Sequence, residues 1–148
     1  MCIFIGVANM TVIYPAIFTE TKDEKDTILI YIPDLDGMTE GYGIDDSIKM
    51  AKDFIGNALC NKKDSEFPVP SAIENVKVEQ SCFSEAGTSF VSLVDIDIDL
   101  FRKMAKNHNV RRNITLPEWL DEMATKAKIN VSAVAQMALK ETLGVAGF

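Results

Sequence analysis

The stretch that most constrains the fold is a short run near the end of the chain, Val110 to Pro117, with the sequence V-R-R-N-I-T-L-P. Its aliphatic residues Ile114 and Leu116 alternate with polar residues, a pattern typical of a strand with one aliphatic and one polar face. A single strand leaves its backbone donors and acceptors unpaired along both edges. The run therefore predicts a strand that must find a partner.

Two short amphipathic helices are predicted directly after this strand. Pro117 suits the first helical position, Asn130 suits the cap of a second helix, and Gly144 suits its end. Such a unit, of fewer than about forty residues, is too small to bury two apolar stripes alone, so we expect it to pair with a second copy. The stripes consist of Leu120, Met123, Ala124 and Ala127, and of Val131, Val134, Ala135, Ala138 and Leu139.

This order of strand, helix and helix resembles the ribbon-helix-helix family of DNA-binding proteins over residues 110–143. The polar alternation before L-P, the helix spacing and the N-V-S opening of the second helix carry the resemblance. It implies a dimer whose paired strands enter the major groove, where Arg111, Asn113 and Thr115 contact bases. The alternative is an edge strand and helical hairpin within a larger core. The residues expected to contact phosphates are Arg112, which departs from the family's usual aliphatic residue, and Asn130, Val131 and Ser132.

The charge of the chain is divided between its two parts. Residues 1–101 contain 7 Lys, no Arg and 18 acidic residues, giving −11, whereas residues 102–148 contain 8 basic and 4 acidic residues, giving +4. This division predicts a polyanionic partner for residues 102–148, the tail, and a cationic partner for residues 1–101, the body. The alternative is that the acidic residues of the body only confer solubility.

The cysteines and the N-terminal residues indicate the cellular compartment in which the protein is expected. Cys2, Cys60 and Cys82 are odd in number and lack C-x-x-C spacing, so we expect neither a disulfide framework nor a metal or other cofactor. The first 19 residues carry no charged side chain, but they lack a basic start and are interrupted by Pro15. We therefore expect a cytoplasmic protein with no membrane partner. Met10 is an alternative start, with the residues before it as an upstream extension.

The body predicts an antiparallel sheet with one helix. Asp45 and Asp46 suit the first turn of a helix that extends to Leu59 and packs on the sheet. The glycine-rich stretch before it, P-D-L-D-G-M-T-E-G-Y-G, is expected to be a chain reversal. The strands are expected at Thr11–Glu20, Thr27–Ile32 and Phe90–Leu100, with a short one at Val76–Val78.

The motifs Y-P-A-I-F, I-P-D-L-D-G-M-T-E-G and D-D-S-I-K-M-A, at these spacings, resemble the HicB antitoxin family, and the resemblance spans about residues 11–143. It implies an α+β protein with a partial ribonuclease-H-like domain, an antiparallel sheet of about three strands plus a helix, which binds and blocks a HicA toxin. HicA is a small basic ribonuclease. The resemblance also implies that a C-terminal ribbon-helix-helix unit dimerises and represses the operon. Gly43 and Met38 depart from the family pattern without affecting this inference.

Three carboxylates of the body could form either a nuclease site or a binding surface. Asp95, Asp97 and Asp99 are expected on one face of the last strand of the body, with Asp34 and Asp36 in a nearby loop. A two-metal site needs carboxylates from different elements, whereas alternate residues of one strand lie about 7 Å apart. We therefore expect no enzyme and take the three aspartates as candidates for toxin binding.

The predicted organisation is a toxin-binding domain over residues 10–101, a linker over 102–109 that holds the only histidine, His108, and a DNA-binding and dimerisation domain over 110–148. The predicted function is an antitoxin that neutralises a HicA-type ribonuclease and represses its own operon on operator DNA. The alternative is a free-standing ribbon-helix-helix repressor with a ligand-sensing body. Assembly of the homodimers into higher oligomers is left open.

Overall fold

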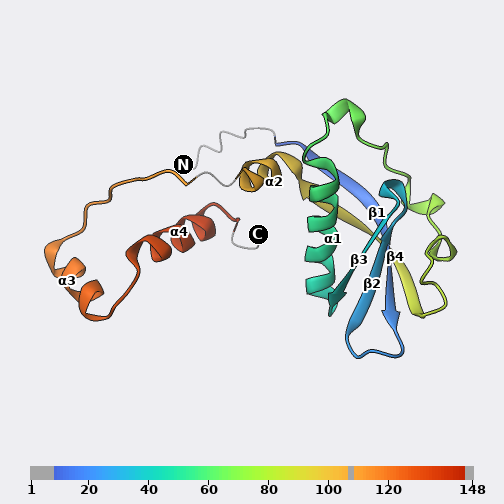
Figure 1. Ribbon diagram of the computed structural model, residues 1–148, viewed down its shortest axis with the longest axis horizontal. Helices are drawn as coiled ribbons and strands as arrows, with labels where there is room; N and C mark the ends of the chain where they lie inside the picture. Colours follow the sequence, from blue (N-terminus) through green and yellow to red (C-terminus); the bar gives the residue numbers. More distant parts are fainter. Residues whose placement is uncertain (1–8, 107–108, 146–148) are drawn as a thin grey trace. The chain divides into compact units, whose positions relative to one another are not determined.

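The computed structural model describes residues 9–106 and 109–145 of the chain. These residues form two compact units that divide between residues 108 and 109 (Figure 1). Most of the predicted upstream extension before Met10, and His108 in the predicted linker, lie outside the described residues.

The first unit is built on a four-stranded antiparallel sheet with the strand order β3-β2-β1-β4. β1 pairs with β4 along its whole length, from Thr11 opposite Asp97 to Thr21 opposite Gly87. The predicted mixed α+β class is confirmed, with four strands where about three were expected. The strands are β1 (Thr11–Thr21), β2 (Thr27–Ile32), β3 (Gly37–Tyr42) and β4 (Gly87–Asp97).

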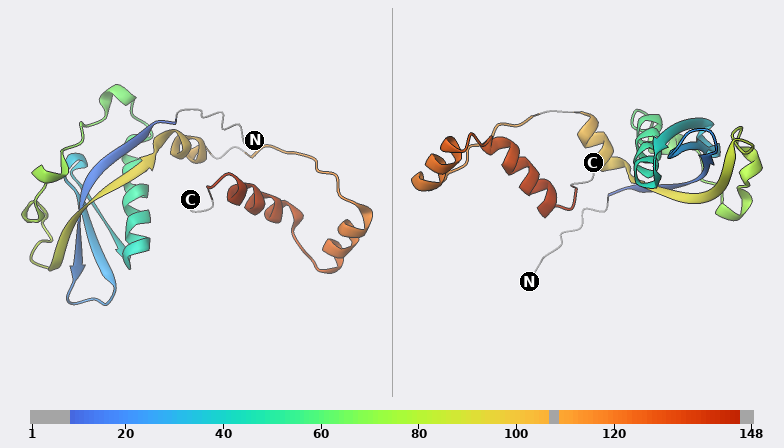
Figure 2. Two further views of the ribbon diagram at one scale, coloured as in Figure 1. Left: turned by 180° about the vertical axis from the view of Figure 1, so that it is seen from behind. Right: turned by 90° about the horizontal axis from the view of Figure 1, so that it is seen from below.

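One face of this sheet packs against the helix α1 (Ile44–Leu59), as the apolar spacing predicted (Figures 1 and 2). Ala51, Ile55 and Leu59 are buried on the helix, and alternate residues of β1 such as Phe18 meet them from the sheet. Burial of such apolar area is the main force that stabilises the unit.

β3 corrects the predicted chain reversal. Only Pro33–Leu35 turns, as a short 3-10 helix, and Asp36 follows it in the left-handed region at φ 45°. The chain then forms β3. The glycines of this strand do not make a turn; they are needed because α1 approaches the strand closely. A Cβ atom at Gly41 would lie 2.5 Å from the Cα atom of Ser47.

The last strand of the body ends earlier than predicted. β4 stops at Asp97, and the helix α2 (Ile98–Ala105) begins immediately after it. The carboxylate of Asp97 accepts a hydrogen bond from the Leu100 N–H at 2.9 Å, which caps α2. The predicted linker is therefore wrong over residues 102–105, which belong to α2.

The segment between α1 and β4 contains no strand. Residues 60–86 follow an irregular path with short 3-10 turns. The strand predicted at Val76–Val78 is absent, because the turn Ile73–Asn75 precedes it and the turn Val78–Gln80 begins at its last residue. The side chain of Val76 is nonetheless buried. Its apolar character is used for packing without strand pairing.

The second unit contains the two predicted helices, α3 (Glu118–Lys126) and α4 (Val131–Thr142). Pro117 immediately precedes α3. The side-chain oxygen of Asn130 accepts a hydrogen bond from the Ala133 N–H at 3.1 Å, which confirms the predicted cap. Gly144 has φ +70° and follows the end of α4, as its position in the sequence predicted.

Candidate DNA-binding and partner-binding surfaces

The segment that precedes α3 is extended and exposed to solvent (Figure 1). Residues 109–117 form no secondary structure, and Arg111, Asn113 and Thr115 are exposed. The side chains of Val110 and Ile114 are also exposed, at 79% and 57%. The predicted strand is therefore absent from a single copy, and its pairing with a second copy stays a prediction.

The second unit does not bury its own apolar residues. No residue between 109 and 145 is buried, and Trp119, Met137 and Leu143 are more than half exposed. Exposed apolar patches of this kind are typical of interaction sites. One copy of this unit lacks a hydrophobic core.

The N-terminus of α4 has free capacity for an anion. The oxygen of Asn130 is already used as the cap of Ala133. The N–H groups of Val131 and Ser132 lie in the first turn, where a helix offers them no acceptor of its own. Ser132 is exposed and Val131 is half-buried, so backbone N–H groups are better placed than the Asn130 side chain to meet a phosphate.

The three aspartates of the body do not share one strand face, which corrects the prediction. Only Asp95 lies within β4 as an exposed strand residue, and it pairs with Lys52 of α1 at 3.1 Å. Asp97 caps α2. Asp99 lies on α2 and accepts a hydrogen bond from the Met10 backbone N–H at 2.8 Å. Two of the three carboxylates are thus used in hydrogen bonds to backbone N–H groups of the first unit.

The other carboxylates considered for a nuclease site have local partners as well. Asp34 accepts hydrogen bonds from the Ser71 hydroxyl at 2.6 Å and the Ser71 N–H at 2.9 Å. Asp36 accepts one from the Tyr31 hydroxyl at 3.2 Å, and burial followed by this bond raises the pKa of Tyr31. Within the described residues, no three His, Cys, Asp or Glu side chains are placed to hold a metal ion.

A family model for the HicB_like antitoxin of bacterial toxin-antitoxin systems matches residues 14–138, which cover most of both units. The chain belongs to the HicB-like antitoxin family. No match was found among curated proteins. Within the described residues, no helix of this HicB-like antitoxin has the length and apolar character needed to cross a membrane.

Two solved structures are similar to this HicB-like antitoxin. A chain of a toxin-antitoxin complex from Streptococcus pneumoniae is 24% identical, with a TM-score of 0.56 and coverage of 90% of this chain and 99% of that chain. This likeness shows a shared fold. The antitoxin HicB of Burkholderia pseudomallei is 22% identical, with a TM-score of 0.43 and coverage of 90% and 97%.

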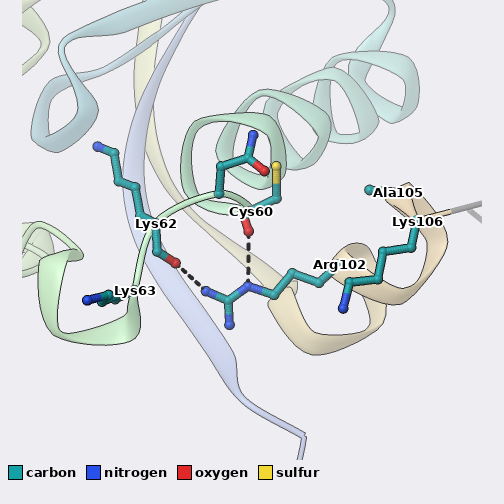
Figure 3. Close-up of a pocket in the computed structure, with 7 residues that line it drawn as sticks. Cys60, Lys62, Lys63, Arg102, Ala105 and Lys106 are labelled. Carbon is teal, nitrogen blue, oxygen red and sulfur yellow. Dashed lines mark hydrogen bonds between the residues drawn. The ribbon is translucent and has the colours of Figure 1, made fainter.

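Sequence reasoning missed the role of Arg102 in this HicB-like antitoxin. Its guanidinium donates hydrogen bonds to the carbonyl oxygens of Cys60 at 3.3 Å and Lys62 at 2.7 Å (Figure 3). It also donates one to the carboxylate of Asp64 at 2.8 Å. It also lies over the Phe67 ring, 5.4 Å from the ring centroid. Arg102 therefore joins α2 to the segment that follows α1.

The pocket around Arg102 is not a convergent anion site. Cys60, Lys62, Lys63 and Lys106 line it, but the Lys62 and Lys63 side chains extend away from Arg102 (Figure 3). The guanidinium is already satisfied by carbonyl oxygens and Asp64. Arg102, which the sequence placed in the linker, thus connects two segments of the first unit.

Proposed function

We propose that the first unit of this HicB-like antitoxin binds and blocks a HicA-type ribonuclease toxin, and that the second unit pairs with a second copy to bind operator DNA. On this proposal the protein works by binding alone, without catalysis or a cofactor, in the cytoplasm. Toxin capture and repression of the operon are assigned to different parts of one chain.

The observation that carries the proposal is the incomplete second unit. Its apolar side chains, among them Trp119, Met137 and Leu143, have no core to enter within the described residues 109–145. Pairing of residues 110–116 with the same run of a second copy would supply the missing strand partner and cover these side chains. A ribbon-helix-helix dimer has this arrangement.

Exposure of the polar residues in the same run supports DNA as its ligand. Arg111, Asn113 and Thr115 share one parity, so a paired strand would present all of them on one face. A two-stranded ribbon fits the major groove, where Arg and Asn match the edges of guanine and adenine. Arg112 has the opposite parity and is assigned to phosphate contact, together with the first turn of α4, which begins after Asn130.

The charge of the first unit supports a cationic protein partner. Residues 1–101 carry −11 without a single Arg. Opposite charge accelerates encounter with a basic protein, while apolar contacts slow its release. We assign the sheet and α1 to the partial ribonuclease-H-like domain that makes this contact.

Two assays on the full chain test the proposal. The chain and the product of an adjacent small basic gene are co-expressed and purified, and ribonuclease activity of that product is titrated with the chain. Binding to DNA from upstream of the gene pair is measured in parallel. Inhibition and sequence-preferring DNA binding are both expected. DNA binding without any inhibited partner would instead support a free-standing repressor with a ligand-sensing body.

A further inference from the structure

One long edge of the sheet is open in the first unit. β4 is an outer strand, and within the described residues β1 is its only strand neighbour (Figure 1). Two backbone hydrogen bonds fix which β4 residues bond to β1: Lys22 N–H to Ala86 O at 3.2 Å, and Ile98 N–H to Met10 O at 3.0 Å. Both involve even-numbered positions on either side of β4.

This parity identifies the backbone groups at the open edge. In an antiparallel ladder alternate residues bond to the same neighbouring strand, so the even residues of β4 bond to β1. The odd residues direct their N–H and C=O groups outward. They are Gly87, Ser89, Val91, Leu93 and Asp95, and no backbone partner for these groups lies among the described residues.

The edge lacks most of the features that normally prevent strand pairing, and Asp95 and Asp97 are its only charged residues. Natural edge strands are short, or carry Lys, Pro or a bulge. β4 is 11 residues long, G-T-S-F-V-S-L-V-D-I-D, and contains neither Lys nor Pro. Its register with β1 is continuous, without a bulge. Phe90 and Leu93 are exposed on it. An edge of this kind is suited to accept another strand.

We propose that β4 pairs antiparallel with β4 of a second copy, about a two-fold axis at Ser92, so that one sheet continues across two chains. Ser92 is the middle residue of the strand, so this register overlaps β4 completely. It also places Val91 opposite Leu93 and Phe90 opposite Val94. Apolar side chains thus meet apolar side chains on both faces.

The same register keeps carboxylates from facing each other, and its self-complementarity points to a second copy as the occupant. Asp95 and Asp97 of one chain lie opposite Ser89 and Gly87 of the other, so no two carboxylates face each other directly. An axis at Leu93 would instead set Asp95 opposite Val91, and an axis at Val91 would set Phe90 opposite Ser92. Self-complementarity in one register is the property that a two-fold interface requires.

This contact goes beyond the proposed function, because neither toxin capture nor DNA binding requires two sheets to join. It is also separate from pairing of the second unit. A chain with two self-complementary contacts, one in each unit, can assemble beyond a dimer.

Disulfide formation at the axis tests the proposal in the full chain. Ser92 is an even residue, so two copies of it would form a non-hydrogen-bonded pair with Cα atoms about 4.5 Å apart, within the range of a disulfide. S92C is made in a chain whose three cysteines, Cys2, Cys60 and Cys82, are replaced by Ser. The control is T88C in the same background. In the proposed register Thr88 lies opposite Ile96, and the two copies of Thr88 are about 27 Å apart.

After mild oxidation, we expect S92C to run mainly as a disulfide-linked dimer and T88C to stay monomeric on a non-reducing gel. Thr88 is exposed whereas Ser92 is half-buried, so random collision would cross-link T88C first. L93K should abolish the S92C cross-link, because it places an ammonium group against Val91. Absence of the S92C dimer, an equal amount of T88C dimer, or persistence of the cross-link with L93K would each overturn the proposal.

Two further measurements on the same preparations separate possible causes. Circular dichroism and a thermal melt establish that every variant folds, so that loss of the cross-link reports on the contact. DNA binding reports independently on the second unit. A cross-linked S92C that does not bind DNA would contradict the proposed function of the tail and leave the sheet contact supported.

Discussion

The Arg102 guanidinium donates a hydrogen bond of 2.7 Å to the backbone carbonyl oxygen of Lys62, and through it α2 is fastened to the chain that leaves α1. Gly56 of α1 supports the same junction, since a Cβ atom there would lie 2.4 Å from the Phe101 ring. α2 is therefore an integral part of the first unit. The covalent connection to the second unit begins only after it.

Replacement of Arg102 by Ala should destabilise the first unit. The change leaves the carbonyl oxygens of Cys60 and Lys62 without their donor, and we expect a loss of about 1–3 kcal/mol in the free energy of unfolding. Chemical denaturation monitored by circular dichroism measures it. Lys103→Ala, at an exposed neighbouring position, is the control and should change little. Equal stability of R102A and the wild type would show that the hydrogen bonds of Arg102 contribute nothing to the free energy of unfolding.

Replacement of Gly41 by Ala should separate β3 from α1. The added methyl group would meet the Ser47 backbone at 2.5 Å, and two backbones must move apart to accept it. We expect a loss of about 1–3 kcal/mol in stability, as for other overpacked sites. Glu40→Ala, an exposed position on the same strand, is the matched control. A melting temperature of G41A equal to that of the wild type would contradict the close approach.

Tyr14 should link the stability of the first unit to alkaline pH. Its hydroxyl donates a hydrogen bond to the Pro68 carbonyl oxygen at 2.7 Å, and burial, followed by the nearby Asp34 carboxylate, raises the pKa of the phenol above 10. A raised pKa in the folded state favours the neutral phenol, so its contribution is complete below about pH 10 and falls as the pH rises through the folded pKa.

Y14F should therefore cost about 0.5–1.5 kcal/mol at neutral pH, from the lost hydrogen bond. Above pH 10 its stability should decline less steeply with pH than that of the wild type. Denaturant unfolding across this pH range measures both effects. Y42F, at a position 65% exposed, is the control. Parallel pH profiles of Y14F and the wild type would rule out this role of Tyr14.

The elements with local chemical signals were the ones that the sequence predicted well. The sequence correctly placed the start of α4 at Asn130 and its end at Gly144. A side-chain cap and a left-handed glycine act within one turn of the helix, so both signals are local. The apolar spacing of α1 likewise identified its buried face.

The boundary between β4 and α2 could not be found from alternation alone. Val94, Ile96 and Ile98 are all buried, although Ile98 belongs to a helix, because the first helical turn continues onto the same core. The sequence D-I-D-L contained a usable signal, since Asp97 lies three residues before Leu100 and caps it. β3 was missed because its glycines, which normally indicate turns, are required here by contact with α1.

The DNA-binding assignment is tested residue by residue in the tail. Arg111→Ala should lower operator affinity by about 1–3 kcal/mol and relax sequence preference, as expected for loss of a contact to a base edge. Arg112→Ala should weaken binding to operator and scrambled DNA equally, because a phosphate contact carries no sequence information. Binding isotherms on both DNAs separate the two outcomes. A change of preference in R112A alone would reverse the assigned strand parity.

The central claim is that one chain binds a toxin with its first unit and DNA with its second. The most direct measurement is the inhibition of the toxin's ribonuclease activity by the full chain carrying both Arg111→Ala and Asn113→Ala, with operator binding measured on the same sample. We predict inhibition equal to that of the wild type together with loss of operator binding. Parallel loss of inhibition in this variant, with the fold intact by circular dichroism, would contradict the claim.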